Sequence, residues 1–274
     1  MARPPSGLRR SAPILAHKEP GAPSLFTPES LLCEARRQKA LPRGRVPGVC
    51  VLDPDGDIVR YLLQTRRARR SARWACYHTD LHVFRRAGLR YGIVGGAVGA
   101  AFAVLVAEEL FASGCRLLIS MTSAGQIVPV REPPYFVLID RALRDEGTSY
   151  HYLPPADYSE ADRRLIRLTA AGLSRLRVAV ERGTVWTTDA PFRETAAAVD
   201  ACRARGILAV EMEAAALYAF ARARRRAVLC FAHVTNRMAQ IEGDFEKGEA
   251  DGAQEALEVI SAAARASKGA RRDR

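Results

Sequence analysis

The sequence lacks any uninterrupted apolar run long enough for an ordinary transmembrane helix. Its longest apolar stretch, residues 91–111, carries Glu108 and Glu109 near its end, whereas a bilayer requires about 20 consecutive apolar residues. Three prolines within the first sixteen residues interrupt any apolar core that a signal peptide would need. We therefore expect a cytoplasmic protein that makes no contact with a membrane.

Paired cysteines are also absent. None of the six cysteines belongs to a C-x-x-C motif, and most lie in apolar runs: Cys33, Cys50, Cys76, Cys115, Cys202 and Cys230. This pattern argues against a zinc site or a disulfide framework and favours reduced thiols. The sequence contains neither an organic-cofactor motif nor a cluster of metal ligands, so we expect no cofactor and no metal.

Acidic residues are in deficit, with 30 Asp and Glu against 42 Lys and Arg, which gives a net charge of +12. Such an excess is typical of proteins with an anionic partner such as phosphate, a nucleotide or a nucleic acid. The alternative is a general preference for arginine in a GC-rich genome, because the positive charges are scattered outside residues 66–73 and 265–274. The terminal run has no interleaved aromatic residues on which bases could stack, so binding of nucleic acid is not expected.

The pattern of the chain predicts a single α/β domain. Residues 1–28 are rich in proline and are expected to form a flexible arm, residues 29–267 the domain, and residues 268–274 a basic tail. Thr27 and Pro28 have the character of a helix N-cap and first turn. A strand, a glycine-containing loop, a helix and another strand follow one another within residues 90–121, which is typical of a parallel sheet.

Apolar runs and amphipathic stretches alternate through the domain, so we expect a central mixed, largely parallel sheet flanked by helices. Strands are expected at residues 46–53, 90–94, 116–121, 135–140, 177–181, 184–187, 208–210 and 227–234. Helices are expected at residues 58–63, 98–112, 158–176, 194–205, 213–224 and 252–267. Ligands of such sheets bind beyond the carboxyl ends of the strands, and several polar clusters follow the expected strands.

Two of these clusters suit an anion. Gly56 and Arg60 follow the first strand and would supply a close backbone approach and a guanidinium. Small and hydroxylated residues at 95–96 and 122–125, including Ser123, can offer hydroxyl and N–H donors to a phosphate. The ordinary alternatives are a βα turn with a surface arginine and close packing of a helix on a strand.

Three further clusters suit a sugar and a base. Glu211, Met212 and Glu213 precede an alanine-rich helix, and a carboxylate there can accept hydrogen bonds from sugar hydroxyls, although acids also favour a helix start electrostatically. An aromatic residue within 183–192 can stack on a base. Residues 233–237 contain an amide and a guanidinium that can read a heterocycle, or they simply form a strand exit.

The order of these clusters resembles the nucleoside phosphorylase superfamily over roughly residues 46–262, and its uridine phosphorylase-like branch above all. The Glu-Met-Glu segment before a small-residue helix is the most specific element, and Asn236-Arg237 after the last strand is similar to uridine phosphorylases. The resemblance implies that Gly56, Arg60 and Ser123 bind phosphate. It also implies that Ser123, Met212 and Glu213 bind ribose.

For the base, the resemblance implies contacts from Phe192, Asn236 and Arg237, and it makes Arg60, Glu213 and Arg237 the catalytic residues. The implied activity is that of a pentosyltransferase. Inorganic phosphate, the only co-substrate, would cleave the N-glycosidic bond of a nucleoside, pyrimidine-type in this branch, to a free base and a pentose 1-phosphate. Family members complete each site across a subunit interface, so a homo-oligomer (a dimer or a hexamer of dimers) is expected, with the arm and residues 66–79 at the interface.

Three departures from the family pattern keep alternatives open. Ser120 stands where uridine phosphorylases have a phosphate-binding arginine, so a hydrolase that uses water is one alternative. Residues 193–197 do not match the residues that read uracil. Asn236 stands where purine-cleaving relatives have an acid that protonates the base, which weighs against purines. The positive charge supports a second alternative, a non-catalytic protein that binds nucleotides or nucleic acid.

Overall fold

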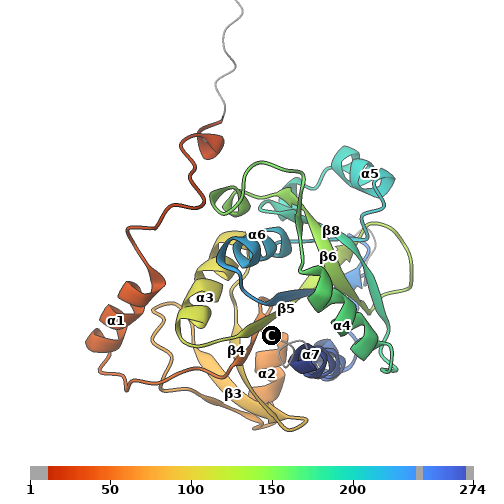
Figure 1. Ribbon diagram of the computed structural model, residues 1–274. Helices are drawn as coiled ribbons and strands as arrows, with labels where there is room; N and C mark the ends of the chain where they lie inside the picture. The colour runs from red at the N-terminus through yellow and green to blue at the C-terminus, as the bar shows by residue number, and fades with distance from the viewer. Residues whose placement is uncertain (1–11, 239–242, 270–274) are drawn as a thin grey trace, which may run out of the picture.

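In the computed structural model, which describes residues 12–238 and 243–269, a ten-stranded mixed sheet forms the centre of the molecule (Figure 1). The strands are β1 (Val49–Asp53), β2 (Ala68–Arg70), β3 (Leu81–Arg86), β4 (Leu89–Gly95), β5 (Leu117–Gln126), β6 (Tyr135–Asp145), β7 (Tyr158–Glu160), β8 (Val180–Thr188), β9 (Ala209–Glu211) and β10 (Val228–Asn236). The α-helices are α1 (Pro28–Gln38), α2 (Asp57–Gln64), α3 (Ala100–Ala112), α4 (Arg163–Leu173), α5 (Ala196–Ala204), α6 (Ala214–Arg224) and α7 (Ala253–Gly269).

The sheet closes on itself at one side. Strand β10 pairs with both β5 and β6, and β9 pairs with both β5 and β8, so β5, β10, β6, β8 and β9 form a ring. The remaining main strands extend from β5 in the order β1, β4, β3 and β2. The single mixed-sheet domain confirms the predicted fold class. Antiparallel pairings are more frequent than expected, because β9 reverses against β5 and β2, β3 and β4 form an antiparallel meander.

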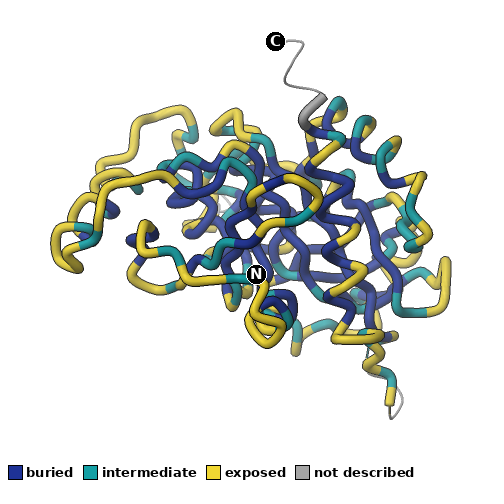
Figure 2. Tube along the Cα trace, turned by 90° about the horizontal axis from the view of Figure 1, so that it is seen from below, coloured by how far each residue is buried: buried dark blue, intermediate teal, exposed yellow. Residues whose placement is uncertain are grey.

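Helices cover both faces of the sheet. In Figure 1, α2, α4 and α7 lie on one side and α3 and α6 on the other, with α1 packed outside α3. Seven consecutive residues of α6, residues 214–220, are buried, and four of them are alanines, whose small side chains permit close packing of the helix on its neighbours. Figure 2 shows the buried segments concentrated in the sheet and these helices, with exposed loops around them.

Several expected boundaries are confirmed. The Thr27 hydroxyl accepts a hydrogen bond from the Ser30 N–H at 3.2 Å, and Pro28 occupies the first turn of α1. Gly114, just past the end of α3, has a φ of +103°, which suits a glycine after a helix. The helix expected at 252–267 is α7, one residue later at its start and two at its end.

Other sequence-based expectations were wrong. Strands β2 and β3 were missed, because their charged residues disguise the alternation of apolar side chains. The helix expected at 158–176 begins five residues later, because residues 158–160 form β7, which pairs with β6. The two short strands expected at 177–181 and 184–187 are one strand, β8, which runs through Gly183.

Residues 12–27 run away from the sheet and include one 3-10 turn, η1 (Pro13–Leu15), none of whose residues is buried (Figure 1). The Lys18 ammonium lies 3.1 Å from the His151 ring, and Ile14 lies against Gly147. Residues 1–11 and 270–274, parts of the expected arm and tail, lie outside the described residues.

Candidate active site

Four loops meet at the carboxyl ends of β1, β4, β5 and β9. The Ser123 N–H donates to the Asp55 carboxylate at 2.7 Å, which joins β5 to the loop after β1. The Gly99 N–H donates to Glu213 Oε1 at 2.7 Å, which joins the loop after β4 to the start of α6. The structure therefore brings together Gly56, Ser123 and Glu213 from the predicted site, at the edge of the sheet where they were expected.

Glu213 has an unsatisfied oxygen at the centre of this site. Its side chain is 1% exposed, and its Oε2 has no hydrogen-bond partner among the described residues. Burial, and then the charge of Glu211, raises the pKa of Glu213. A buried oxygen without a partner destabilises the protein, so its presence indicates a ligand that supplies a donor at this position.

Glu211 is buried beside Glu213 but is fully satisfied. It accepts hydrogen bonds from the Thr187 hydroxyl and from the N–H groups of Glu213 and Ala214, the latter two at 2.7 and 2.8 Å. Burial raises its pKa as well. Glu211 accepts three hydrogen bonds, whereas Glu213 accepts one from the Gly99 N–H and lies beside the Thr122 hydroxyl. We therefore assign the negative charge of the pair to Glu211 and the proton to Glu213 when no ligand is bound.

The Thr187 hydroxyl supports this arrangement from β8, since it donates to Glu211 and accepts from the Ala215 N–H at 3.0 Å. We expect Thr187→Val to lower the free energy of unfolding by about 1–3 kcal/mol, because the substitution leaves buried groups unsatisfied. Urea denaturation measures this loss. Thr169→Val is the matched control, because Thr169 is equally buried and its hydroxyl has no partner among the described residues. Equal losses in the two variants would contradict the role of the Thr187 hydroxyl.

The predicted anion loop has the expected backbone but an unexpected charge pattern. Gly56 has a φ of +77°, a conformation that favours glycine, and the space beside it is open. Arg60 pairs with Asp57 at 2.7 Å and with Asp251 at 3.4 Å. Asp57 also accepts from Lys247 at 2.5 Å. Arg60 is thus already engaged by carboxylates, although half of its side chain remains exposed.

Sequence analysis missed Asp55, Lys247 and Asp251 in this cluster. Asp251 lies in a run of three residues with positive φ, Ala250 to Gly252, and left-handed non-glycine residues of this kind often mark functional sites. Gly252 is also required sterically, because a Cβ there would meet the His233 ring. The sequence of residues 243–252, which is rich in glycine and charged residues, was the available indication of a functional loop. Nothing in the sequence indicated that this loop contacts the loop after β1.

Ser120 provides no replacement for the missing arginine. It is 1% exposed within β5, between β1 and β10, and its hydroxyl has no partner among the described residues. Two cations pair with Asp57 in the described part of the chain, Lys247 at 2.5 Å and Arg60 at 2.7 Å. The cluster therefore has two cations, Arg60 and Lys247, among three aspartates.

The structure does not assemble the predicted base contacts. Phe192 is 98% exposed, and the Arg237 guanidinium pairs with Glu132. The Asn236 amide is used locally, since its Oδ1 accepts from the Met238 N–H at 2.9 Å and its Nδ2 donates to Thr235 at 3.2 Å. Met212 is half-buried next to Glu213. Any base pocket must therefore form by rearrangement of these side chains or with another subunit.

Within residues 12–238 and 243–269, no group of three or more His, Cys, Asp or Glu side chains is placed to hold a metal ion. Over the same residues, no helix combines the length and the apolar character needed to cross a membrane.

The chain belongs to the phosphorylase superfamily, whose family model matches residues 52–269. Its fold is uridine phosphorylase-like. A crystal structure of uridine phosphorylase from Vibrio fischeri in complex with 6-hydroxy-1-naphthoic acid superposes with a TM-score of 0.67 at 22% identity, over 80% of this chain and 90% of that one. A second crystal structure of the Vibrio fischeri enzyme gives a TM-score of 0.65 at 23% identity, over 80% and 91% of the two chains. The resemblance found in the sequence is confirmed at the level of superfamily and fold.

Proposed function

We propose that the protein cleaves the N-glycosidic bond of a nucleoside and that Glu213 holds the sugar. The supporting observation is the buried, unpartnered Oε2 of Glu213 at the carboxyl ends of the strands. A sugar hydroxyl would satisfy this oxygen, which lies beside the Thr122 hydroxyl. The single negative charge of the Glu211–Glu213 pair would stabilise the cation-like sugar formed as the bond breaks.

For the attacking group we propose inorganic phosphate. Gly56 presents open backbone, Ser123 supplies an N–H donor, and Arg60 and Lys247 supply positive charge within one cluster. Phosphate would have to displace the Asp55 carboxylate from Ser123 and compete with Asp57 and Asp251 for the two cations. The products would be a free base and a pentose 1-phosphate, without an organic cofactor.

Water is a second candidate for the attacking group, and a specific observation favours it. The Asp55 carboxylate already occupies the Ser123 N–H at 2.7 Å, so an anion at this position is opposed by a fixed negative charge. A carboxylate at the same place is suited to accept a proton from water. In that case the protein would be a phosphate-independent nucleoside hydrolase.

We propose a pyrimidine-type base because Asn236 has no proton to give to a purine leaving group, and because the structural relatives are uridine phosphorylases. A homo-oligomer is proposed as well, since Phe192 is almost fully exposed and the base contacts are incomplete in one chain. A cytoplasmic location, the flexible arm at 1–28 and the basic tail at 268–274 remain proposals of the same kind.

The decisive experiment measures base release from a panel of purine and pyrimidine nucleosides, each with and without inorganic phosphate. We expect release from a pyrimidine nucleoside that depends on phosphate. Equal release of base without phosphate would show that the protein is a hydrolase and not a phosphorylase. No release from any nucleoside, together with unchanged folding, would reject glycosidic cleavage in favour of a binding protein.

A further inference from the structure

A cavity in the described residues lies away from the candidate active site. It has a volume of about 760 Å³ and is lined by the first residues of β5 and β10, Leu117 and Val228. Because these strands end at the candidate site, with Ser123 and Asn236, the cavity opens at the opposite edge of the sheet. The volume falls within the range of small-molecule sites, about 300–1,000 Å³.

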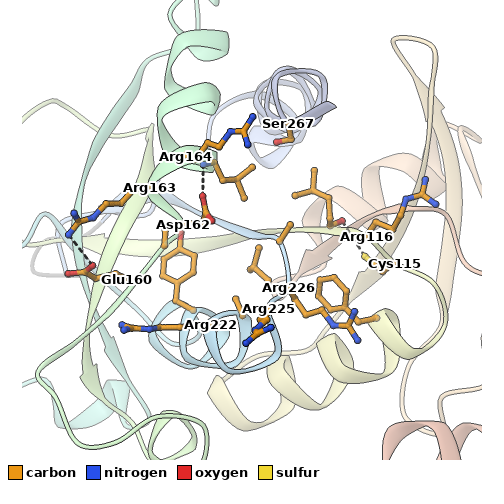
Figure 3. Close-up of a pocket in the computed structure, with 18 residues that line it drawn as sticks. Cys115, Arg116, Glu160, Asp162, Arg163, Arg164, Arg222, Arg225, Arg226 and Ser267 are labelled. Carbon is orange, nitrogen blue, oxygen red and sulfur yellow. Dashed lines mark hydrogen bonds and ion pairs between the residues drawn. The ribbon is translucent and has the colours of Figure 1, made fainter. Parts of the chain in front are cut away.

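The cavity has an apolar floor and a basic rim. Buried side chains form the floor, among them Phe111, Leu165 and Tyr218. Six arginines and only two acidic residues line the cavity: Arg116, Arg163, Arg164, Arg222, Arg225, Arg226, Glu160 and Asp162. Figure 3 shows Arg163 and Arg164 extending from α4 on one side, Arg222 and Arg225 from the end of α6 on another, and Arg116 on a third.

The two acids do not neutralise this rim. Asp162 caps α4, accepting from the Leu165 N–H at 2.8 Å. Glu160 lies 3.7 Å from Arg163, whose side chain is 92% exposed. The side chains of Arg222 and Arg225 make no hydrogen bond or ion pair with any described residue. At the end of α6 the cavity therefore keeps the positive charges of Arg222 and Arg225 over a floor of low polarity, which strengthens their field.

Helices α6 and α4 meet the rim of the cavity with opposite ends. Cations at the end of α6 are favourable, since the C-terminus of a helix is partially negative. At the start of α4 the Asp162 carboxylate already caps the partially positive helix end, and Arg163 lies beside Glu160. An anion in the cavity would therefore be held by the arginines at the end of α6.

We propose that this cavity binds a nucleotide with two or three phosphate groups. The guanidinium groups of Arg222 and Arg225 at the end of α6 would pair with the phosphates, which they match in a bidentate manner. The planar base would lie against the apolar floor near Phe111, whose ring already carries the Arg226 guanidinium at 5.3 Å. This site is separate from the one proposed to cleave nucleosides, and its occupancy does not depend on that activity.

The test variant is Arg222→Ala/Arg225→Gly. Arg225 has a φ of +52° at the end of α6, so glycine removes the charge and also relieves backbone strain. Alanine at 222 preserves helix propensity. The double variant is thus expected to fold at least as stably as the parent protein. Arg85→Ala/Arg175→Ala is the matched control. Both residues are exposed and lie outside the cavity, and their substitution removes the same amount of positive charge as the test variant does.

Isothermal titration calorimetry at physiological salt would use ATP, UTP, inorganic tripolyphosphate and a single-stranded oligonucleotide. We expect a triphosphate nucleotide to bind more tightly than tripolyphosphate. In the test variant its Kd should rise about 100-fold, since each charge-assisted contact contributes about a factor of ten or more. The control variant and Glu213→Gln should bind as the parent protein does.

Four results would overturn the proposal. Absence of nucleotide binding would reject the site, and equal weakening in the two double variants would indicate non-specific attraction to a basic protein. If tripolyphosphate bound as tightly as ATP and UTP, the base would contribute nothing to affinity, and the proposed contact between the base and the apolar floor would be rejected. Binding of the oligonucleotide but not of the nucleotides would make the rim a surface for nucleic acid. None of these results bears on nucleoside cleavage, which the panel of nucleosides tests separately.

Discussion

Replacement of Glu213 by alanine should lower kcat/KM for nucleoside cleavage by about 100-fold or more, because a contact that positions the sugar is lost. The fold should persist, since the substitution removes a buried carboxylate with an unsatisfied oxygen. Steady-state kinetics and circular dichroism measure the two properties. Unchanged activity in a folded variant would move the sugar site elsewhere.

The same residue should make stability depend on pH. Burial, followed by the charge of Glu211, raises the pKa of Glu213 from 4.5 to about 8. The folded protein therefore holds a proton that the unfolded chain releases, so stability falls as pH rises across that interval. Glu213→Gln cannot ionise and should escape this loss.

Thermal denaturation of Glu213→Gln and the parent protein at pH 5 and pH 8 measures the effect. The Tm of the variant relative to the parent protein should rise between the two pH values and be higher than the parent value at pH 8. A difference in Tm that is the same at both pH values would show that Glu213 titrates normally. Activity lost together with stability gained would identify a residue retained for function at the expense of the fold.

Asp55→Ala should distinguish phosphorolysis from hydrolysis. If phosphate is the attacking group, removal of the carboxylate from the Ser123 N–H should lower the KM for phosphate about tenfold, which corresponds to about 1.4 kcal/mol of relieved repulsion. This is the result that we expect. If water attacks instead, the variant should lose about 100-fold or more of its activity, because its general base is gone.

Asp200→Ala is the control for this experiment, since Asp200 is an exposed acid on α5 that pairs only with Arg203 in the described chain. It should leave the KM for phosphate unchanged. A similar fall in both variants would mean that the overall charge of the protein, and not the position of Asp55, controls phosphate binding.

The sequence predicted those parts of the site whose chemistry is local. Glu213 was found because a strand, two acids and an alanine-rich helix follow one another within a few residues. Gly56 was found because its loop directly follows an apolar strand. Contacts between distant segments were beyond the sequence, since Lys247 reaches Asp57 across 190 positions and the Gly99 N–H reaches Glu213 across 114.

The side chains of Arg237 and Phe192 illustrate another limit. Their positions in the chain match the family pattern, but side-chain orientation depends on neighbours that the pattern does not contain, such as Glu132 beside Arg237. The prediction also missed the charged strands β2 and β3, for a related reason. Strand β2 is short and mostly exposed, and the buried residues of β3, Leu81 and Phe84, do not alternate regularly with polar ones, so the pattern that marks a half-buried strand is weak.

Closure of the strand ring has a consequence for how copies of the protein meet each other. Every strand of the main order except β2 has neighbours on both sides, so β2 is its open edge. An open edge is a template for pairing with another chain. Strand β2 reads Ala68-Arg69-Arg70, and both arginines are exposed. Arg70 is paired with Asp80 at 2.7 Å, so Arg69 supplies the like charge that disfavours edge-to-edge pairing of two copies through β2.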